Sequence, residues 1–236
     1  MTKLGEFSLD NIKQNLTNIY KNIEKSAIKS NRTKDDITLI AVTKTIDIER
    51  MTELFNLGVC NFGENKVQEL LEKYPFFSKD IKWHFIGHLQ TNKVKYIIDK
   101  VCMIHSVDSL KLAEEIDKYA KKFGLVMDIL IQVNVSGEES KFGIKPEELN
   151  SLLEKISKLY NISVKGLMTI APFSENPKYN KLYFAKMQKL LVDNRLKTFD
   201  NIYMNFLSMG MTNDYEVAIE EGANLVRIGS AIFGAR

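Results

Sequence analysis

Apolar residues near the start of the chain recur at steps of three and four positions. They are Leu9, Ile12, Leu16, Ile19, Ile23 and Ala27. An α-helix has about 3.6 residues per turn, so this spacing puts all of these side chains on one face. The pattern predicts an amphipathic helix from about Ser8 to Ser30.

Beyond this helix, short apolar runs alternate with stretches of helical periodicity. The runs suited to strands are Ile37–Thr43, Val59–Phe62, Lys82–Ile86, Val101–Val107, Met127–Val135, Ile162–Ile170, Tyr203–Leu207 and Leu225–Ile228. Helices are expected near Ile48–Leu57, Lys66–Lys73, Thr91–Asp99, Leu110–Phe123, Glu147–Leu159, Tyr179–Arg195 and Tyr215–Glu221. Regular alternation of strands and helices is typical of a parallel sheet.

These repeated units predict an α/β protein, a closed (β/α)₈ TIM barrel with an extra N-terminal helix. The chain has 236 residues, and such barrels run to about 250 residues. We therefore expect one domain over residues 1–236. An open, doubly wound sheet is the alternative, but the first predicted strand is not followed by the glycine-rich fingerprint of dinucleotide-binding folds.

Composition gives no support for a nucleic-acid-binding, membrane or metal-binding protein, but it does not point to a particular function. Charged residues make up 27% of the chain and the net charge is +3, which gives no electrostatic reason to expect nucleic acid or a membrane surface as partner. No signal peptide and no long apolar run is apparent, so a cytoplasmic protein is expected. Cys60, Cys102 and the three histidines lack the spacing of metal ligands, which predicts no metal site and buried, reduced thiols.

The ends of three predicted strands carry the candidate chemistry. Lys44 closes the first strand, Ser208-Met-Gly-Met211 follows the seventh, and Gly229-Ser230 follows the eighth at the start of a short last helix. In a barrel these ends share one rim, where phosphate commonly binds after the last two strands. Glycine lets backbone N–H groups approach an anion, and a helix N-terminus favours negative charge. A lysine amine facing a phosphate cradle is the outline of a pyridoxal phosphate site.

Residues near these strand ends can be interpreted as ligand-binding residues or as ordinary structural residues. Arg227, beside the cradle, could donate to a phosphate oxygen or to an aromatic ring nitrogen. Serine and glycine after a strand are also common turn residues, and Met168 and Met211 are suited to packing. His84, between Trp83 and Phe85, is read as a half-buried structural histidine.

Several motifs along the chain resemble the pyridoxal phosphate homeostasis proteins, also called the proline synthase co-transcribed family. The motifs are Ala41-Val-Thr-Lys44, Phe62-Gly-Glu-Asn65, Trp83-His-Phe-Ile-Gly87, Leu89-Gln90, Asn92-Lys93, Asn134-Val-Ser, Lys141-Phe-Gly143, Gly166-Leu-Met168, Ser208-Met-Gly-Met211 and Val226-Arg-Ile-Gly-Ser-Ala-Ile-Phe-Gly-Ala-Arg236. The resemblance runs from about Ile37 to Arg236.

This resemblance implies a barrel similar to the N-terminal domain of alanine racemase that carries pyridoxal 5′-phosphate (PLP). By it, Lys44 would form the Schiff base and Arg227 would lie near the cofactor, where the racemase arginine faces the pyridine nitrogen. Asn65 and Met168 would line the pocket. The phosphate cradle would consist of Ser208, Gly210, Met211, Gly229 and Ser230.

A PLP carrier is favoured over an enzyme. Racemisation needs an acid or base on each face of the substrate, and the racemase takes the second from an extra domain that 236 residues do not encode. An arginine against the ring nitrogen also weakens the ring as an electron sink. We expect a monomeric protein that gives PLP to apo PLP-dependent enzymes. The alternatives are a racemase using Lys44 with His84 or a tyrosine, and a barrel enzyme whose Lys44 forms an imine with a ketose phosphate.

Overall fold

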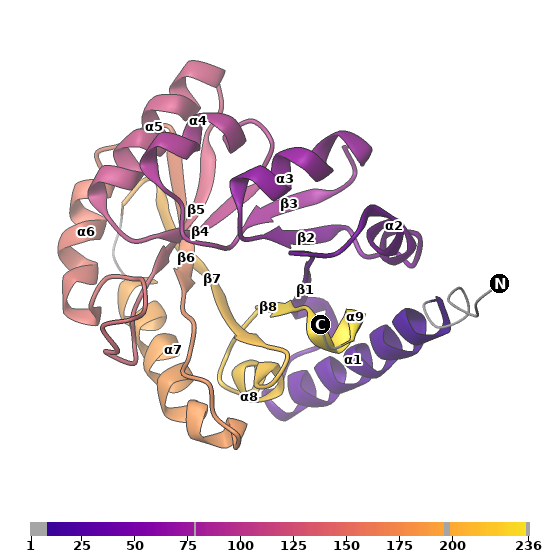
Figure 1. The fold of residues 1–236 in the computed structure, drawn as a ribbon. Helices are drawn as coiled ribbons and strands as arrows, with labels where there is room; N and C mark the ends of the chain where they lie inside the picture. The colour runs from indigo at the N-terminus through magenta and orange to yellow at the C-terminus, as the bar shows by residue number, and fades with distance from the viewer. Residues whose placement is uncertain (1–8, 78, 196–198, 235–236) are drawn as a thin grey trace.

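The computed structural model describes residues 9–77, 79–195 and 199–234 (Figure 1). Its strands are β1 (Thr38–Val42), β2 (Asn61–Glu64), β3 (Lys82–Phe85), β4 (Met103–Val107), β5 (Met127–Gln132), β6 (Ile162–Met168), β7 (Ile202–Met211) and β8 (Leu225–Ile228). Its α-helices are α1 (Leu9–Lys29), α2 (Ile48–Asn56), α3 (Val67–Lys73), α4 (Val94–Ile97), α5 (Leu110–Phe123), α6 (Leu149–Ile156), α7 (Lys181–Arg195), α8 (Tyr215–Glu220) and α9 (Ser230–Phe233).

The eight strands form a closed parallel barrel in sequence order. β1 pairs with β8, with Ile40 opposite Arg227 and Ala41 opposite Ile228. Helices surround the strands on the outside (Figure 1). The predicted (β/α)₈ barrel is confirmed, and the open sheet is excluded.

One strand boundary differs from the prediction in a way that affects the site. β7 continues to Met211, whereas the sequence pattern ended it at Leu207. The ladder persists because Ser208 pairs with Met168 of β6 and Met211 pairs with Arg227 of β8. Ser208 is therefore a strand residue of the barrel wall, not a loop residue.

The N-terminal helix α1 supports the end of the chain. Its apolar face is buried, as predicted, with Ile12, Leu16, Ile19 and Ile23 each at most 5% exposed. It packs against α8 and α9 (Figure 1), and the Asn15 amide donates to the Ile232 carbonyl over 3.0 Å. The predicted first residue, Ser8, and the final Ala235-Arg236 of the last motif lie outside the described residues.

Two apolar clusters divide the core. The larger cluster joins the strands to the helices, and a smaller one contains Ile40, Met103, Leu130, Met168 and Leu225. Side chains alternate between the faces of a strand, and members of the small cluster alternate with members of the large one. The small cluster therefore fills the barrel interior, where polar residues join it: His84, His105, Ser208 and Arg227, each at most 5% exposed.

Some expectations from composition can be compared with the structure. Both cysteines are free, but Cys60 is only half-buried and Cys102 is exposed, so the prediction of two buried thiols was wrong. Cys102 directly precedes β4, at the edge of the barrel wall. No helix in the described part of the chain combines the length and apolarity that crossing a bilayer requires. The described residues contain no group of three His, Cys, Asp or Glu placed to hold a metal ion.

Candidate functional site

Lys44 lies in the turn that follows β1, on the rim formed by the carboxyl ends of the strands. Its side chain is half-buried. The next residue, Thr45, has a φ of 62°, a left-handed conformation that is uncommon for a residue with a branched side chain. The Thr45 N–H donates to the Glu69 carboxylate of α3. This bond offsets the backbone strain and fixes the direction in which the chain leaves Lys44.

A buried cluster of charges lies beneath this turn. Lys73 Nζ is 2.8 Å from Glu64 Oε1 and 2.6 Å from Glu69 Oε1, and it donates to the Thr43 carbonyl over 2.6 Å. The Thr43 hydroxyl donates to Glu64 over 2.6 Å. Burial raises the pKa of Glu64, while its hydrogen bonds to Lys73 and Thr43 oppose that rise. The cluster ties the Lys44 turn to β2 and α3.

Asn65 follows β2 on the same rim, and its side chain carries a buried acceptor oxygen to which no group among the described residues donates. Its side-chain Oδ1 is buried and has no hydrogen-bond partner. Gly87, after β3, packs against the backbone of Asn65, and an added Cβ would lie 2.2 Å from the backbone carbonyl oxygen of Asn65. Buried amide oxygens are normally satisfied, so this site suits a ligand that supplies a donor.

The segments after β7 and β8 converge through Thr212. Its hydroxyl oxygen lies 3.4 Å from the backbone N of Gly229 and 3.4 Å from that of Ala231. The Met211 N–H donates to Asp214 Oδ1 over 2.7 Å, which shapes the turn before α8. Backbone N–H groups at the start of α9 therefore face an oxygen, the arrangement by which helix N-termini hold anions. Thr212 was not among the predicted site residues, although it directly follows the predicted segment Ser208-Met-Gly-Met211.

The other predicted cradle residues lie around this convergence. Gly210 has a φ of 88°. An added Cβ at Gly229 would lie 3.3 Å from both Cβ and O of Val42, so the end of β8 packs closely on the end of β1, two residues before Lys44. Ser230 is exposed at the first position of α9, and Met211 is 39% exposed at the end of β7.

Arg227 and Ser208 interact inside the barrel. Arg227 is 3% exposed, and it donates to Ser208 Oγ over 2.6 Å and to the Thr169 carbonyl over 2.8 Å. Burial lowers the pKa of Arg227 to about 10, against the raising effect of Asp214, so the guanidinium remains charged at neutral pH. Ser208 is fully buried at this contact, and its hydroxyl also lies 3.0 Å from His105 Nδ1. Met168 is also fully buried in the barrel interior.

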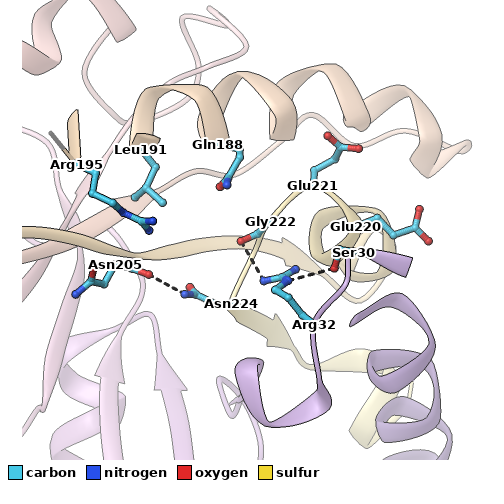
Figure 2. Close-up of a pocket in the computed structure, with 10 residues that line it drawn as sticks. All are labelled: Ser30, Arg32, Gln188, Leu191, Arg195, Asn205, Glu220, Glu221, Gly222 and Asn224. Atoms are coloured by element: carbon cyan, nitrogen blue, oxygen red, sulfur yellow. Dashed lines mark hydrogen bonds between the residues drawn. The ribbon is translucent and has the colours of Figure 1, made fainter. Parts of the chain in front are cut away.

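A cavity of about 430 Å³ lies at the opposite end of the barrel (Figure 2). Several of its polar groups already have structural partners. Arg32 donates to Ser30 Oγ and to the carbonyls of Gly222 and Ala223, and the Asn224 amide donates to the Asn205 carbonyl over 2.8 Å. Since Arg32 precedes β1 and Asn224 precedes β8, this cavity is on the far side from Lys44. Its bonds hold the α1–β1 connection against α8 and β8.

Comparisons of sequence and structure show which known proteins this chain is similar to. The family model for "Alanine racemase, N-terminal domain" matches residues 8–236. A pyridoxal phosphate homeostasis protein of Aquifex aeolicus is 46% identical over 224 residues, 94% of this chain and 97% of the relative. The solved structure of PipY of Synechococcus elongatus with PLP bound has a TM-score of 0.82 at 30% identity, covering 94% of this chain and all of PipY.

A more distant structure shares the fold alone. Alanine racemase of Clostridium difficile has a TM-score of 0.73 at 19% identity, covering 97% of this chain. The match takes in only 57% of the racemase chain. The barrel described here therefore corresponds to part of the racemase, and the remainder of that enzyme has no counterpart in the match.

Proposed function

Because this chain belongs to the family of pyridoxal phosphate homeostasis proteins, we propose that it binds pyridoxal 5′-phosphate on the rim around Lys44 and serves PLP homeostasis. PLP supplies an aldehyde that a lysine amine captures reversibly. The observation that carries the proposal is the convergence of Lys44, the Thr212–Gly229–Ala231 contacts and Arg227 at one end of the barrel. PLP bound to PipY supports it.

Each part of the rim suits one part of the cofactor. The backbone N–H groups of Gly229 and Ala231, with the hydroxyls of Thr212 and Ser230, would hold the phosphate dianion. Gly210 and Met211 would shape this cradle, and Asn65 Oδ1 would accept from a polar group of the ligand. Arg227 would face the ring nitrogen, and Met168 would close the pocket from below. In this assignment, Ser208 orients Arg227 and does not contact the phosphate.

The proposed role is carriage of PLP to apo PLP-dependent enzymes, not catalysis. An arginine facing the ring nitrogen keeps it unprotonated, which weakens the ring as an electron sink. The histidine considered as a second acid or base, His84, lies 5% exposed inside the barrel and is bonded to His105 and Asn61. It does not reach the rim where a substrate would meet Lys44.

Mass spectrometry after borohydride reduction tests the proposal. Purified protein incubated with PLP should develop a visible imine absorbance, and reduction should add one pyridoxyl phosphate group to the peptide containing Lys44. The Lys44→Ala variant should gain no such mass. Lys66→Ala, on an exposed lysine near the same rim, serves as the matched control. An unchanged spectrum, or label on other lysines only, would reject Lys44 as the carrier.

Hydrogen exchange separates a carrier from a racemase. Loaded protein incubated with several amino acids in D₂O should leave the α-hydrogen in place, because His84, the histidine considered as a second acid or base, is held inside the barrel. Substantial deuterium incorporation that depends on Lys44 would establish the racemase-like alternative instead.

A further inference from the structure

A line of hydrogen-bonded side chains crosses the barrel interior from β2 to β8. His84 Nε2 lies 3.2 Å from Asn61 Oδ1, and His84 Nδ1 lies 3.0 Å from His105 Nε2. His105 Nδ1 lies 3.0 Å from Ser208 Oγ, which accepts from Arg227 over 2.6 Å. Both histidines are at most 5% exposed. Four barrel strands besides β8 therefore contribute one polar residue each to a path that ends at Arg227.

The chemistry of these groups sets the direction of every bond. An amide oxygen only accepts, so His84 must donate from Nε2, and its Nδ1 must then accept. The facing His105 Nε2 therefore donates, which leaves His105 Nδ1 to accept from the Ser208 hydroxyl. Ser208 donates to His105 and accepts from Arg227. The order of donation is Arg227, Ser208, His105, His84, Asn61, with both imidazoles neutral.

The opposite direction leaves a buried donor without an acceptor. With the Asn61 amide turned over, each histidine would carry its proton on Nδ1, and Ser208 Oγ would accept from both His105 and Arg227. The Ser208 proton would then have no acceptor among the described residues, which is costly in a fully buried position. Cys102 Sγ lies 3.6 Å from His84 Nε2. A thiol is a weak donor and a weak acceptor, so it can pair with Nε2 in either arrangement and does not decide between them.

The surroundings keep both histidines neutral. Burial lowers the pKa of His84 to about 4, with Lys82 adding to the shift. Burial also lowers the pKa of His105 well below its ordinary value, and the neighbouring His84 and Arg227 act in the same direction. At physiological pH both imidazoles are therefore neutral, and the hydrogen bonds from Arg227 to Asn61 all run in one direction.

We propose that His105 and His84 are positioning residues for Arg227, acting through Ser208 to fix the guanidinium that faces the cofactor ring. An arginine has five N–H donors, and Ser208 Oγ and the Thr169 carbonyl take two of them. Because His105 holds the Ser208 proton, the serine oxygen stays turned toward Arg227. The remaining donors are then held in one orientation. The inference rests on the proposed function for the position of the ring.

The tautomers can be measured without PLP. Long-range ¹H–¹⁵N spectra of the full chain labelled on histidine should show protons on Nε2 of His84 and His105 throughout pH 6 to 8. His88, the third histidine and exposed, provides the internal reference. A proton on Nδ1 of either buried histidine, or a charged ring in this range, would overturn the proposal. Since Lys44 plays no part in this measurement, its outcome is independent of the proposed function.

The loaded protein supplies the second test. In His105→Phe the Ser208 hydroxyl loses its acceptor. We expect the dissociation constant for PLP to rise roughly tenfold, which corresponds to the loss of about one hydrogen bond to a charged group. The ¹⁵N resonance of the ring nitrogen of bound ¹⁵N-PLP should also move toward the protonated position. Ser106→Ala is the control, because Ser106 is a fully buried β4 neighbour outside this chain of bonds.

A merely structural network gives a different result. His105→Phe would then lower the melting temperature while the ring-nitrogen resonance stayed where the unmodified protein and Ser106→Ala place it, and this outcome would overturn the proposal. Should His105→Phe fail to fold, the tautomer spectra of the unmodified chain still test the proposal, because a proton on Nδ1 of either buried histidine would overturn it.

Discussion

Lys73 brings a positive charge into a nearly water-free space beneath Lys44, where Glu64 and Glu69 surround it. Its side chain is 8% exposed and that of Glu64 is fully buried. Removing one partner of a buried pair leaves an uncompensated charge, which is far more costly than losing a pair on the surface. The pair therefore binds α3 to the turn that presents Lys44.

Replacement of Lys73 should measure that dependence. We expect Lys73→Met to lower the free energy of unfolding by about 3–5 kcal/mol, because Glu64 would stay buried without its cation. Urea unfolding is the measurement. Lys118→Met, on a lysine that is 65% exposed and paired with Glu115, should cost no more than about 1 kcal/mol. Equal losses in the two variants would contradict the buried-pair argument.

The neutral histidines make stability depend on pH with a definite sign. The pKa of His84 is lowered to about 4 in the folded protein, whereas an unfolded histidine has a pKa near 6.5. The unfolded chain binds the proton more readily, so the contribution of His84 is complete above about pH 6.5 and is lost as the pH falls toward 4.

Comparison with a variant isolates this effect from the carboxylates. The free energy of unfolding of the unmodified chain should fall by up to about 1.4 kcal/mol per pH unit more steeply than that of His84→Phe between pH 6.5 and 5. Urea titrations at several pH values provide the numbers. Parallel curves for the two proteins would show that His84 is not held neutral.

Among elements, β7 and α8 meet in a tight contact at Gly210. Gly210 has a φ of 88°, and an added Cβ would lie 2.6 Å from Ala218 Cβ and 2.9 Å from Tyr215 Cα. The strand therefore touches the helix backbone at this point. The contact brings Met211 and Thr212 toward α9, so it determines the shape of the proposed phosphate cradle.

Two glycines with the same backbone conformation test this contact. Gly58 has a φ of 90°, and no atom lies within 4 Å of the Cβ position. Gly58→Ala should cost about 1 kcal/mol from backbone strain alone. Gly210→Ala should cost about 1–3 kcal/mol more, because overlap with α8 is added, and it should weaken PLP binding as well. Thermal unfolding and PLP titration give both quantities, and equal effects at the two glycines would contradict a tight β7–α8 contact.

The elements were largely predictable from the sequence, whereas the contacts of individual side chains were not. Period-two and period-3.6 patterns are local, so the eight strands and α1 could be placed by counting. The end of β7 was missed because Ser208-Met-Gly-Met211 looks like a turn, and only pairing with Met168 and Arg227 keeps it in the sheet. The roles of Thr212 and His105 depend on partners far away in the chain, which no spacing rule reveals. Lys73 has a helical i,i+4 partner in Glu69, but its contact with Thr43 joins residues that are distant in the sequence.

At the scale of the whole molecule, the barrel matches part of alanine racemase of Clostridium difficile in fold. The match takes in 57% of the racemase chain.

We expect the protein to be a monomer in solution. Light scattering coupled to size exclusion should give a mass near 27.1 kDa, with and without PLP. A stable mass of twice this value would contradict the expectation.

Closure of the barrel by β1 and β8 also sets the time at which the protein can begin to work. Lys44 is synthesised well before Arg227, Gly229 and Ser230. A nascent chain that has not yet reached β8 would have the proposed amine without the proposed anion cradle, and we expect it not to retain the vitamin.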